Sequence, residues 1–226
     1  MRVLISLAAA VLVTAAAASA RTTAITSKPS VVAGARYGTV AVYRSPSAKR
    51  PFLTLRNPNL DGAHLVFLVK HRGSGWEQVY LPTRPNGATG WIKDRSVDLS
   101  LDPYRVTVSL GAHMLTVTKL GQIILRTPAG VGRAVLPTPK GTYFVAELLK
   151  QPNASGPYGP FAFGLSAHSN VLQSFGGGPG QIGIHGTNEP AALGTDVSHG
   201  CVRISNASIT RLARMLPLGT PVVIKP

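Results

Sequence analysis

Short runs of β-branched and aromatic residues, separated by turn-forming residues, recur along most of this sequence. Runs of roughly four to eight such residues between clusters rich in Pro, Gly and Asn are typical of β-strands. In the segment 37–102 the expected strands are 39–43, 64–70, 76–81 and 89–92, with turn clusters such as 57–59 (NPN) and 85–87 (PNG) between them. We therefore expect this segment to form a small β-barrel.

A second β-rich domain, 103–226, is expected after Asp102-Pro103, where a proline interrupts the pattern. Residues 104–110 alternate between apolar and other side chains, which is typical of a strand with one buried face. The segment Lys119-Leu120-Gly121 has the glycine that a tight hairpin turn needs at positive φ, so the runs on either side of it should pair. The strands expected here are 104–110, 114–118, 122–126, 143–148, 181–185 and 222–225.

One helix is predicted near the C-terminus. Asn206 is a residue type that can cap a helix. Ile209, Leu212 and Leu216 follow at the spacing of one helix face. The next residue, Pro217, ends this pattern. The fold class predicted for the chain is therefore mainly β, with one or two helices.

The N-terminus has the three parts of an export signal. Arg2 supplies a positive charge, residues 3–17 are apolar, and Ala18-Ser19-Ala20 has the small-x-small form that a signal peptidase reads. We expect a signal peptide at 1–20, a linker at 21–36, and export to the periplasm or the cell wall. The alternative is an uncleaved anchor, because residues 3–20 are near the lower length limit for a bilayer span. Contact with a membrane is expected only in that case.

The chain is strongly basic. Lys and Arg number 23 against 8 Asp and Glu, which gives a net charge of +15, and the basic residues are spread along the sequence. A charge of this size favours an anionic partner, which could be nucleic acid, an anionic surface or an anionic polymer. Export and an aromatic content of only 6% argue against nucleic acid.

Cys201 is the single cysteine of the chain, so no intramolecular disulfide can form and the thiol needs another explanation. It lies in the segment 198–203 (SHGCVR), beside an imidazole and a guanidinium, and such neighbours lower the pKa of a thiol. Gly200 permits a tight turn in which successive backbone amides converge, and a donor cluster of this kind stabilises an oxyanion. The segment therefore predicts a nucleophilic thiolate.

His185 is the candidate general base for this thiol. It ends the strand expected at 181–185, and the loop 189–197 is long enough to bring Cys201 back beside it. A thiol, a histidine from a separate strand and convergent amides together predict an acyl-transfer site.

Other interpretations of these residues, and of the segment just before them, stay open. His185, His199 and Cys201 have the side chains of three zinc ligands. Residues 178–183 fit the G-x-G-x-x-G pattern of dinucleotide binding, although a histidine and a turn follow them where that motif needs a helix. A lone cysteine can also be a small buried residue without a chemical role.

The two motifs resemble those of the L,D-transpeptidases of bacterial cell walls, which have a YkuD-type catalytic domain. The family signature is His-Gly-Thr followed, after about a dozen residues or more, by Ser-His-Gly-Cys-x-Arg or Asn, and the chain has these elements at 185–187 and 198–203. The resemblance extends to 136–143 (LPTPKGTY) and to 158–163 (YGPFAF), which looks like the family's substrate-cleft cover. It spans 104–226, while 37–102 resembles more weakly the SH3-like modules that often precede such domains.

The resemblance implies a role for each motif residue. Cys201 would be the nucleophile that forms a thioester, and His185 the general base and acid, oriented by a backbone carbonyl near Gly186. The backbone amides of His199, Gly200 and Cys201 would form the oxyanion hole. Loop support or substrate contact is implied for four further residues, of which the last could meet a substrate carboxylate: Ser198, Gly186, Thr187 and Arg203. The family uses no metal and no cofactor.

The activity implied by the resemblance is 3→3 cross-linking of peptidoglycan stem peptides. Cys201 would attack the bond between the third, diamino acid residue of a tetrapeptide stem and its terminal D-Ala, and the amine of a second stem's third residue would resolve the thioester. Carbapenem-type β-lactams are implied as covalent inhibitors. The alternatives are an L,D-carboxypeptidase with water as acceptor and a non-catalytic wall-binding protein.

Overall fold

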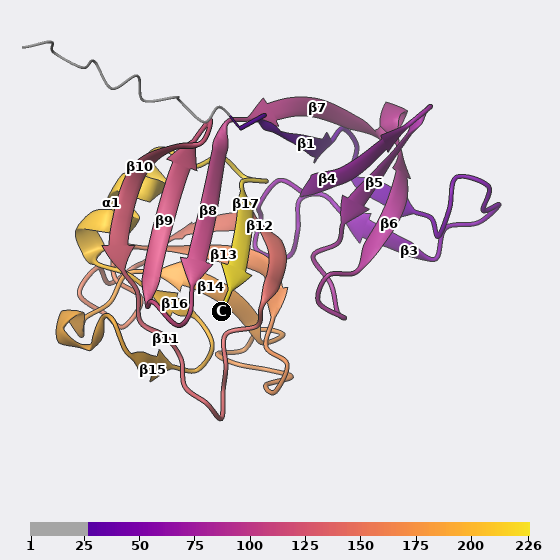
Figure 1. The fold of residues 1–226 in the computed structure, drawn as a ribbon. Coiled ribbons are helices and arrows are strands. Elements are labelled where there is room, and N and C mark those ends of the chain that lie inside the picture. Colours follow the sequence, from indigo (N-terminus) through magenta and orange to yellow (C-terminus); the bar gives the residue numbers. More distant parts are fainter. Residues whose placement is uncertain (1–26) are drawn as a thin grey trace, which may run out of the picture.

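The computed structural model describes residues 27–226, and the signal peptide expected at 1–20 lies outside the described residues. Two larger β-sheets make up most of the structure, one in each half of the chain, and they lie side by side (Figure 1). A search for a membrane-crossing helix among residues 27–226 finds none that is long and apolar enough.

The N-terminal module, residues 30–102, is built on a five-stranded antiparallel sheet in the order β6-β5-β4-β1-β7. A two-stranded ribbon of β2 and β3 joins it through a bridge between Tyr43 and Trp91, and Val40, Phe67 and Ile92 are fully buried in the shared core. The relation of this module to SH3-like barrels stays a prediction. Its strands are β1 (Ser30–Ala35), β2 (Thr39–Val42), β3 (Leu53–Arg56), β4 (Val66–Gly73), β5 (Trp76–Tyr80), β6 (Thr89–Lys93) and β7 (Val97–Asp102).

Strand β1 lies within the segment 21–36 that the sequence predicts as a linker. It pairs with both β4 and β7, which makes it a central strand of the sheet. Its residues in the module core are Ala33 and Ala35. These side chains are too small to produce the alternation of large apolar residues by which a strand is recognised in sequence. Ordered structure therefore begins well before residue 37.

The C-terminal part, residues 103–226, surrounds a mixed eight-stranded sheet in the order β10-β9-β8-β17-β12-β13-β14-β16. Neighbouring strands are antiparallel, except that β17 is parallel to β8 and β16 is parallel to β14. A short parallel pair, β11 with β15, lies outside this sheet. The strands are β8 (Tyr104–Ser109), β9 (Met114–Lys119), β10 (Gln122–Pro128), β11 (Val131–Gly132), β12 (Gly141–Lys150), β13 (Phe161–His168), β14 (Gln181–His185), β15 (Asp196–Ser198), β16 (Val202–Arg203) and β17 (Pro221–Lys225).

Helix α1 (Asn206–Ala213) packs against β13 and β14 and buries Ile209 and Leu212, as their spacing predicts. The residue that caps it is Ser205, whose side chain accepts a backbone N–H of the first turn, and not Asn206 as predicted. The Asn206 side chain has another partner, because its Oδ1 accepts the backbone N–H of Thr187 at 2.8 Å. The helix thereby holds the loop that follows β14.

The two halves of the chain share a small apolar cluster. Val32, Val66 and Leu68 of the N-terminal module pack with Phe144 of β12, which is fully buried. Because a cut between residues 102 and 103 would expose Phe144 to water, the two expected domains, 37–102 and 103–226, have an apolar interface in common.

Candidate active site

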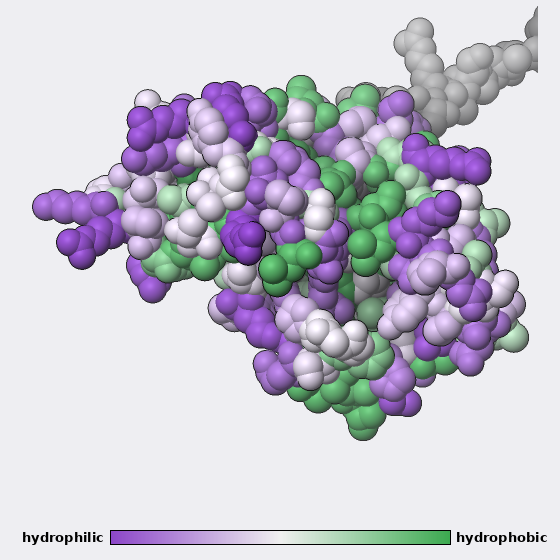
Figure 2. Space-filling model, turned by 180° about the vertical axis from the view of Figure 1, so that it is seen from behind, coloured by the Kyte–Doolittle hydropathy of each residue, from purple (hydrophilic) through white to green (hydrophobic). Residues whose placement is uncertain are grey.

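Two cavities meet at Cys201. The smaller has a volume of about 220 Å³ and the larger about 480 Å³, and Cys201, His185 and Tyr158 line both of them. The surface seen from behind is hollowed, with apolar side chains along the recess (Figure 2). His185 ends β14, and Cys201 immediately precedes β16, which is the parallel neighbour of β14. The topology therefore brings together the two residues that the sequence predicts as a pair.

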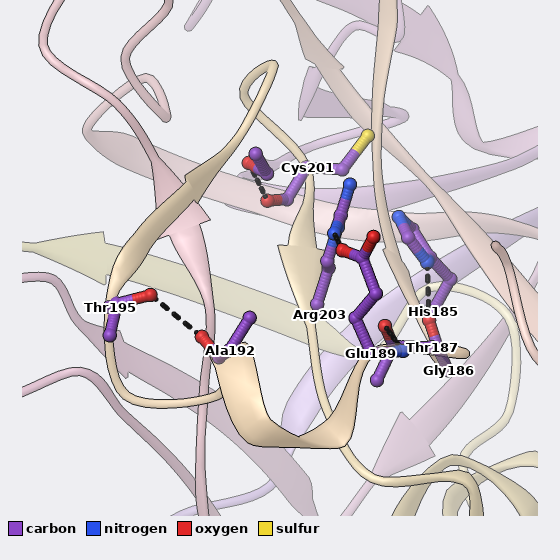
Figure 3. Close-up of polar contacts among 9 residues, drawn as sticks. His185, Gly186, Thr187, Glu189, Ala192, Thr195, Cys201 and Arg203 are labelled. Atoms are coloured by element: carbon purple, nitrogen blue, oxygen red, sulfur yellow. Dashed lines mark hydrogen bonds and ion pairs between the residues drawn. The ribbon is translucent and has the colours of Figure 1, made fainter.

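His185 is buried, and its ring has one hydrogen-bond partner among residues 27–226. Its Nδ1 lies 2.6 Å from the carbonyl oxygen of Gly186 (Figure 3). Because a carbonyl oxygen can only accept, Nδ1 is assigned the proton, and the lone pair is on Nε2. Burial lowers the pKa of His185 to about 4, against a smaller opposing effect of the Gly186 carbonyl. At neutral pH the imidazole is therefore neutral and able to accept a proton.

The thiol of Cys201 differs from the sequence-based expectation. Burial raises its pKa, and this effect outweighs both the hydrogen bond that Sγ accepts from the amide of Gly183 at 3.3 Å and the positive charge of Arg203, which lower it. The charged side chains next to Cys201 in the sequence predict a lowered pKa. Desolvation of the thiolate is stronger than their attraction, so this prediction is wrong. The resting pair is thus a thiol and a neutral imidazole.

The turn before Cys201 depends on Ser198 and Gly200. Gly200 has a φ of +119°, and a Cβ there would lie 2.9 Å from the side chain of Ile182. Ser198 Oγ donates to the carbonyl of Cys201 at 2.5 Å and accepts from the amide of Gly200 at 3.0 Å. The Gly200 amide, expected in an oxyanion hole, is therefore already engaged. Within residues 27–226, the amides of His199 and Cys201 form none of the hydrogen bonds found, so these two stay candidates.

His199 is exposed, and its ring stacks on that of Phe175 with 5.7 Å between the ring centroids. It lines the smaller cavity but not the larger one. His185, in contrast, faces both cavities. The geometry thus gives the two histidines different surroundings, although they are close in sequence to the same thiol.

Arg203 extends from β16 on the same side of the strand as the Cys201 sulfur and the His185 ring (Figure 3). Its Nη1 donates to the carboxylate of Glu189 at 2.9 Å, and its buried Nε has no partner among the described residues. The positive charge of Arg203 lowers the pKa of both His185 and Cys201. The guanidinium therefore keeps donor capacity at the edge of the smaller cavity.

Gly186 and Thr187 shape the loop after β14 and line neither cavity. A Cβ on Gly186 would lie 2.3 Å from Oδ1 of Asn206 and 3.0 Å from the backbone of Gly159. Thr187 donates its amide to Asn206, and its Oγ1 accepts the amide of Glu189 at 3.0 Å. Both residues therefore fit the loop-supporting role and not the substrate-contacting one.

The zinc alternative finds no support in the arrangement of side chains. Among residues 27–226, no group of three or more His, Cys, Asp or Glu residues is placed so that it could hold a metal ion. His185, His199 and Cys201 are thus not assembled as a ligand set.

Two aromatic residues of the site were not predicted as site residues. The ring of Tyr158 meets that of His185 edge to face, with 4.8 Å between the centroids. Phe175 lines both cavities from the segment 169–180. Tyr158 lies in the stretch that resembles a cleft cover, whereas the sequence has no signal for Phe175, which stands among glycines.

The N-terminal module holds the base of the segment 169–180. Arg84 donates three hydrogen bonds to backbone carbonyls there, from Nη1 to Ser169 at 2.5 Å and from Nη2 to Leu172 and Pro179 at 2.9 Å each. Asn86 donates to the carbonyl of His168 at 2.6 Å and accepts its amide at 2.8 Å. A turn of one half of the chain thus fixes a wall of the cavity in the other half.

We expect Arg84→Ala to loosen this wall. The change removes three charge-assisted hydrogen bonds, each worth about 1.5–3 kcal/mol when the donor is ionised, so backbone amides in 169–180 should exchange at least about tenfold faster. Hydrogen exchange with mass spectrometry measures this. Arg50→Ala, which removes the same charge from an exposed site, is the control, and equal exchange in both variants would contradict the expectation.

Residues 103–224 match the family described as the L,D-transpeptidase catalytic domain, YkuD. The match covers more than half of the chain, which therefore belongs to the YkuD family of L,D-transpeptidase catalytic domains.

Similar proteins include the YkuD proteins of Bacillus licheniformis, 35% identical over 124 residues, and Bacillus subtilis, 35% identical over 122 residues. The matches cover 55% and 54% of this chain, and 67% and 66% of the relatives, so the chain spans about two thirds of their length. An L,D-transpeptidase from Mycobacterium smegmatis has 19% identity and a TM-score of 0.47, over 70% of this chain and 80% of that chain. L,D-transpeptidase 3 from Mycobacterium tuberculosis, in complex with a faropenem-derived adduct, has 19% identity and a TM-score of 0.45, over 64% and 76%.

Proposed function

We propose that the protein is a cysteine L,D-transpeptidase that forms 3→3 cross-links between peptidoglycan stems. The observation that carries the proposal is the pairing of a neutral His185, whose Nε2 has no proton, with the only thiol of the chain at the junction of two cavities. A wall-binding protein without chemistry would not need such a pair.

The first half-reaction would acylate Cys201. His185 Nε2 takes the thiol proton as the sulfur attacks the carbonyl carbon between the third stem residue and D-Ala. The oxyanion that forms is placed to accept from the amides of His199 and Cys201. The imidazolium then gives its proton to the departing D-Ala nitrogen, the carbon–nitrogen bond breaks, and a thioester remains.

The second half-reaction would transfer the acyl group to an amine. The amine of a second stem's third residue attacks the thioester carbonyl and loses a proton to His185. The carbon–sulfur bond then breaks, and the sulfur leaves as a thiolate that His185 reprotonates. The two cavities that meet at Cys201 support this scheme, because an acyl donor and an acceptor can approach the sulfur from different sides.

Export to the periplasm or cell wall, with cleavage after Ala20, is part of the proposal. A net charge of +15 would hold the protein to an anionic wall through attraction that weakens with salt. The N-terminal module, proposed to be SH3-like, would add to this retention.

The products formed from purified disaccharide-tetrapeptide test the function. We expect mass spectrometry to detect a cross-linked dimer that has lost one D-Ala. Disaccharide-tripeptide alone would mean that water is the acceptor and the protein is a carboxypeptidase. Unchanged substrate would leave wall binding as the function and refute both enzymatic assignments. A carbapenem is expected to acylate the same thiol and add one drug mass.

A further inference from the structure

The larger cavity is acidic in a basic protein. The carboxyl groups of Asp61 and Glu147 line it, and no Lys or Arg among residues 27–226 does so. The whole chain has only 8 acidic residues against 23 basic ones. Two carboxyl groups without a basic neighbour in the cavity favour a positively charged ligand.

Glu147 is aligned with the sulfur of Cys201 across the sheet. Glu147 of β12 pairs with Gly164 of β13, which pairs with Gly183 of β14. The Gly183 amide in turn donates to Sγ of Cys201 at 3.3 Å. Since neighbouring strands are about 4.8 Å apart, the backbones of Glu147 and Gly183 are separated by about 10 Å. A ligand of one extended side chain could therefore reach from the thioester carbon to this carboxylate.

Gly164, which lies between Glu147 and Gly183 in the sheet, leaves room for the Glu147 carboxyl group. A Cβ on Gly164 would lie 2.3 Å from Oε1 of Glu147 and 2.8 Å from the side-chain nitrogen of Gln181. Any larger residue at this position would push the Glu147 carboxyl group away from the cavity floor. The carboxyl group thus occupies the space over Gly164, on the side that faces the cavity.

One oxygen of the Glu147 carboxyl group is held by the N-terminal module. The residue is 2% exposed, and its Oε2 accepts from Nδ2 of Asn59 at 3.1 Å. Within residues 27–226, Asn59 donates the one side-chain hydrogen bond that meets both distance and angle limits, and the side chains of Gln181 and Asp61 lie close to the carboxyl group as well. Burial raises the pKa of Glu147, and the nearby Asp61 carboxyl group raises it further, whereas the side-chain amides of Asn59 and Gln181 lower it. A cation would relieve this unfavourable burial of negative charge.

Asn59 also fixes the position of Asp61. Its Oδ1 accepts the backbone amides of Asp61 at 3.1 Å and Ala63 at 2.7 Å, while its Nδ2 reaches Glu147. One side chain therefore orders the loop that carries one carboxyl group and contacts the other. The acidic pair exists only where the N-terminal module meets the C-terminal part.

We propose that Glu147 and Asp61 bind the side-chain ammonium group of the diamino acid residue in a stem peptide. This inference rests on the proposed function. An ammonium has three donors, and Oε1 of Glu147 and the Asp61 carboxylate supply acceptors of opposite charge. The apolar side chains of Leu60 and Leu149, which line the same cavity, suit the aliphatic part of such a residue. The N-terminal module thus contributes directly to substrate selection.

Binding to the full-length Cys201→Ala variant tests the proposal without turnover. The probes are a tetrapeptide stem with a free side-chain amine on its third residue and the same peptide with that amine acetylated. We expect the free amine to bind roughly 10- to 100-fold more tightly, the range of a charge-assisted hydrogen bond. Adding Glu147→Gln, which keeps the size of the side chain, should remove this preference. Asp61→Asn, in an exposed loop, should weaken it, and Asp94→Asn, an exposed acid outside both cavities, should leave it unchanged.

Kinetics on the Cys201 enzyme show whether the pair recognises the acyl donor. If Glu147→Gln slows acylation by tetrapeptide, the ammonium belongs to the acyl donor. If it raises only the acceptor concentration needed for dimer formation while acylation is unchanged, the pair does not bind the acyl donor and the proposal fails, because the acceptor's side-chain amine has to attack the thioester itself. Equal preference for the free amine in Glu147→Gln, Asp61→Asn and Asp94→Asn would overturn the proposal even if the wild type forms dimers. Absence of any product from the wild type would overturn the proposed function, while the binding comparison would still decide the role of the pair.

Discussion

Replacing Cys201 with alanine is expected to abolish both cross-linking and acylation by a carbapenem. Cys201 is the only thiol in the chain, so no second thiol can replace it as nucleophile. The loss should exceed that of any other single substitution in the site, because without the sulfur no covalent intermediate can form. Intact-protein mass spectrometry after incubation with a carbapenem measures the acylation, and dimer formation from disaccharide-tetrapeptide measures the turnover.

The fold should survive this change with a small loss of stability. The amide of Gly183 donates to Sγ of Cys201, and alanine leaves that donor without its partner, at a cost of about 1 kcal/mol. Cys201→Ser is the matched variant, because a hydroxyl oxygen can accept the same amide. We expect Cys201→Ser to melt near the wild-type temperature and still fail to form dimers. Dimer formation by Cys201→Ala at more than a trace would show that the thioester mechanism is wrong.

Strands and turns with a strong local signal could be predicted from the sequence. Strand β14 has the predicted bounds, 181–185, because apolar side chains alternate with glycine and glutamine there. The turn at Leu120-Gly121 also forms between paired strands, with both residues at positive φ. In these segments the local sequence was sufficient to predict the backbone conformation.

The parts of the site that could not be predicted depend on contacts between distant segments. Arg84 and Phe175 lie far apart in the sequence, and only the docking of the two halves brings an arginine to the base of the segment that carries Phe175. In the sequence, Glu147 is a charged residue within a strand pattern. Its burial depends on a loop of the N-terminal module, from which Asn59 contacts it. The direction of the Cys201 pKa shift was predicted wrongly for the same reason. The sequence shows which charges adjoin Cys201 but not how deeply the sulfur is buried.

His185→Gln is expected to slow acylation of Cys201 by a factor of about 10² to 10⁴, the usual contribution of a positioned general base. Because the resting pair is a thiol and a neutral imidazole, the proton has to move when the sulfur attacks, and glutamine cannot take it. Glutamine is a suitable replacement, since its side-chain amide can still donate to the Gly186 carbonyl that orients His185. The variant should thus lose the base and keep the shape of the site.

The pH dependence of thiol alkylation separates His185 from His199. With a pKa of about 4, His185 stays unprotonated as the pH falls from neutral, so wild-type reactivity should persist until the pH approaches 4 and then fall as the imidazole gains its proton. Without that base, His185→Gln should react only at higher pH, where hydroxide removes the thiol proton. His199→Gln is the matched control, because His199 is exposed, stacks on Phe175 and would contribute its backbone amide, which the substitution keeps. If His199→Gln shifts the alkylation profile and His185→Gln does not, His199 is the base, and Cys201 alone remains of the proposed pair.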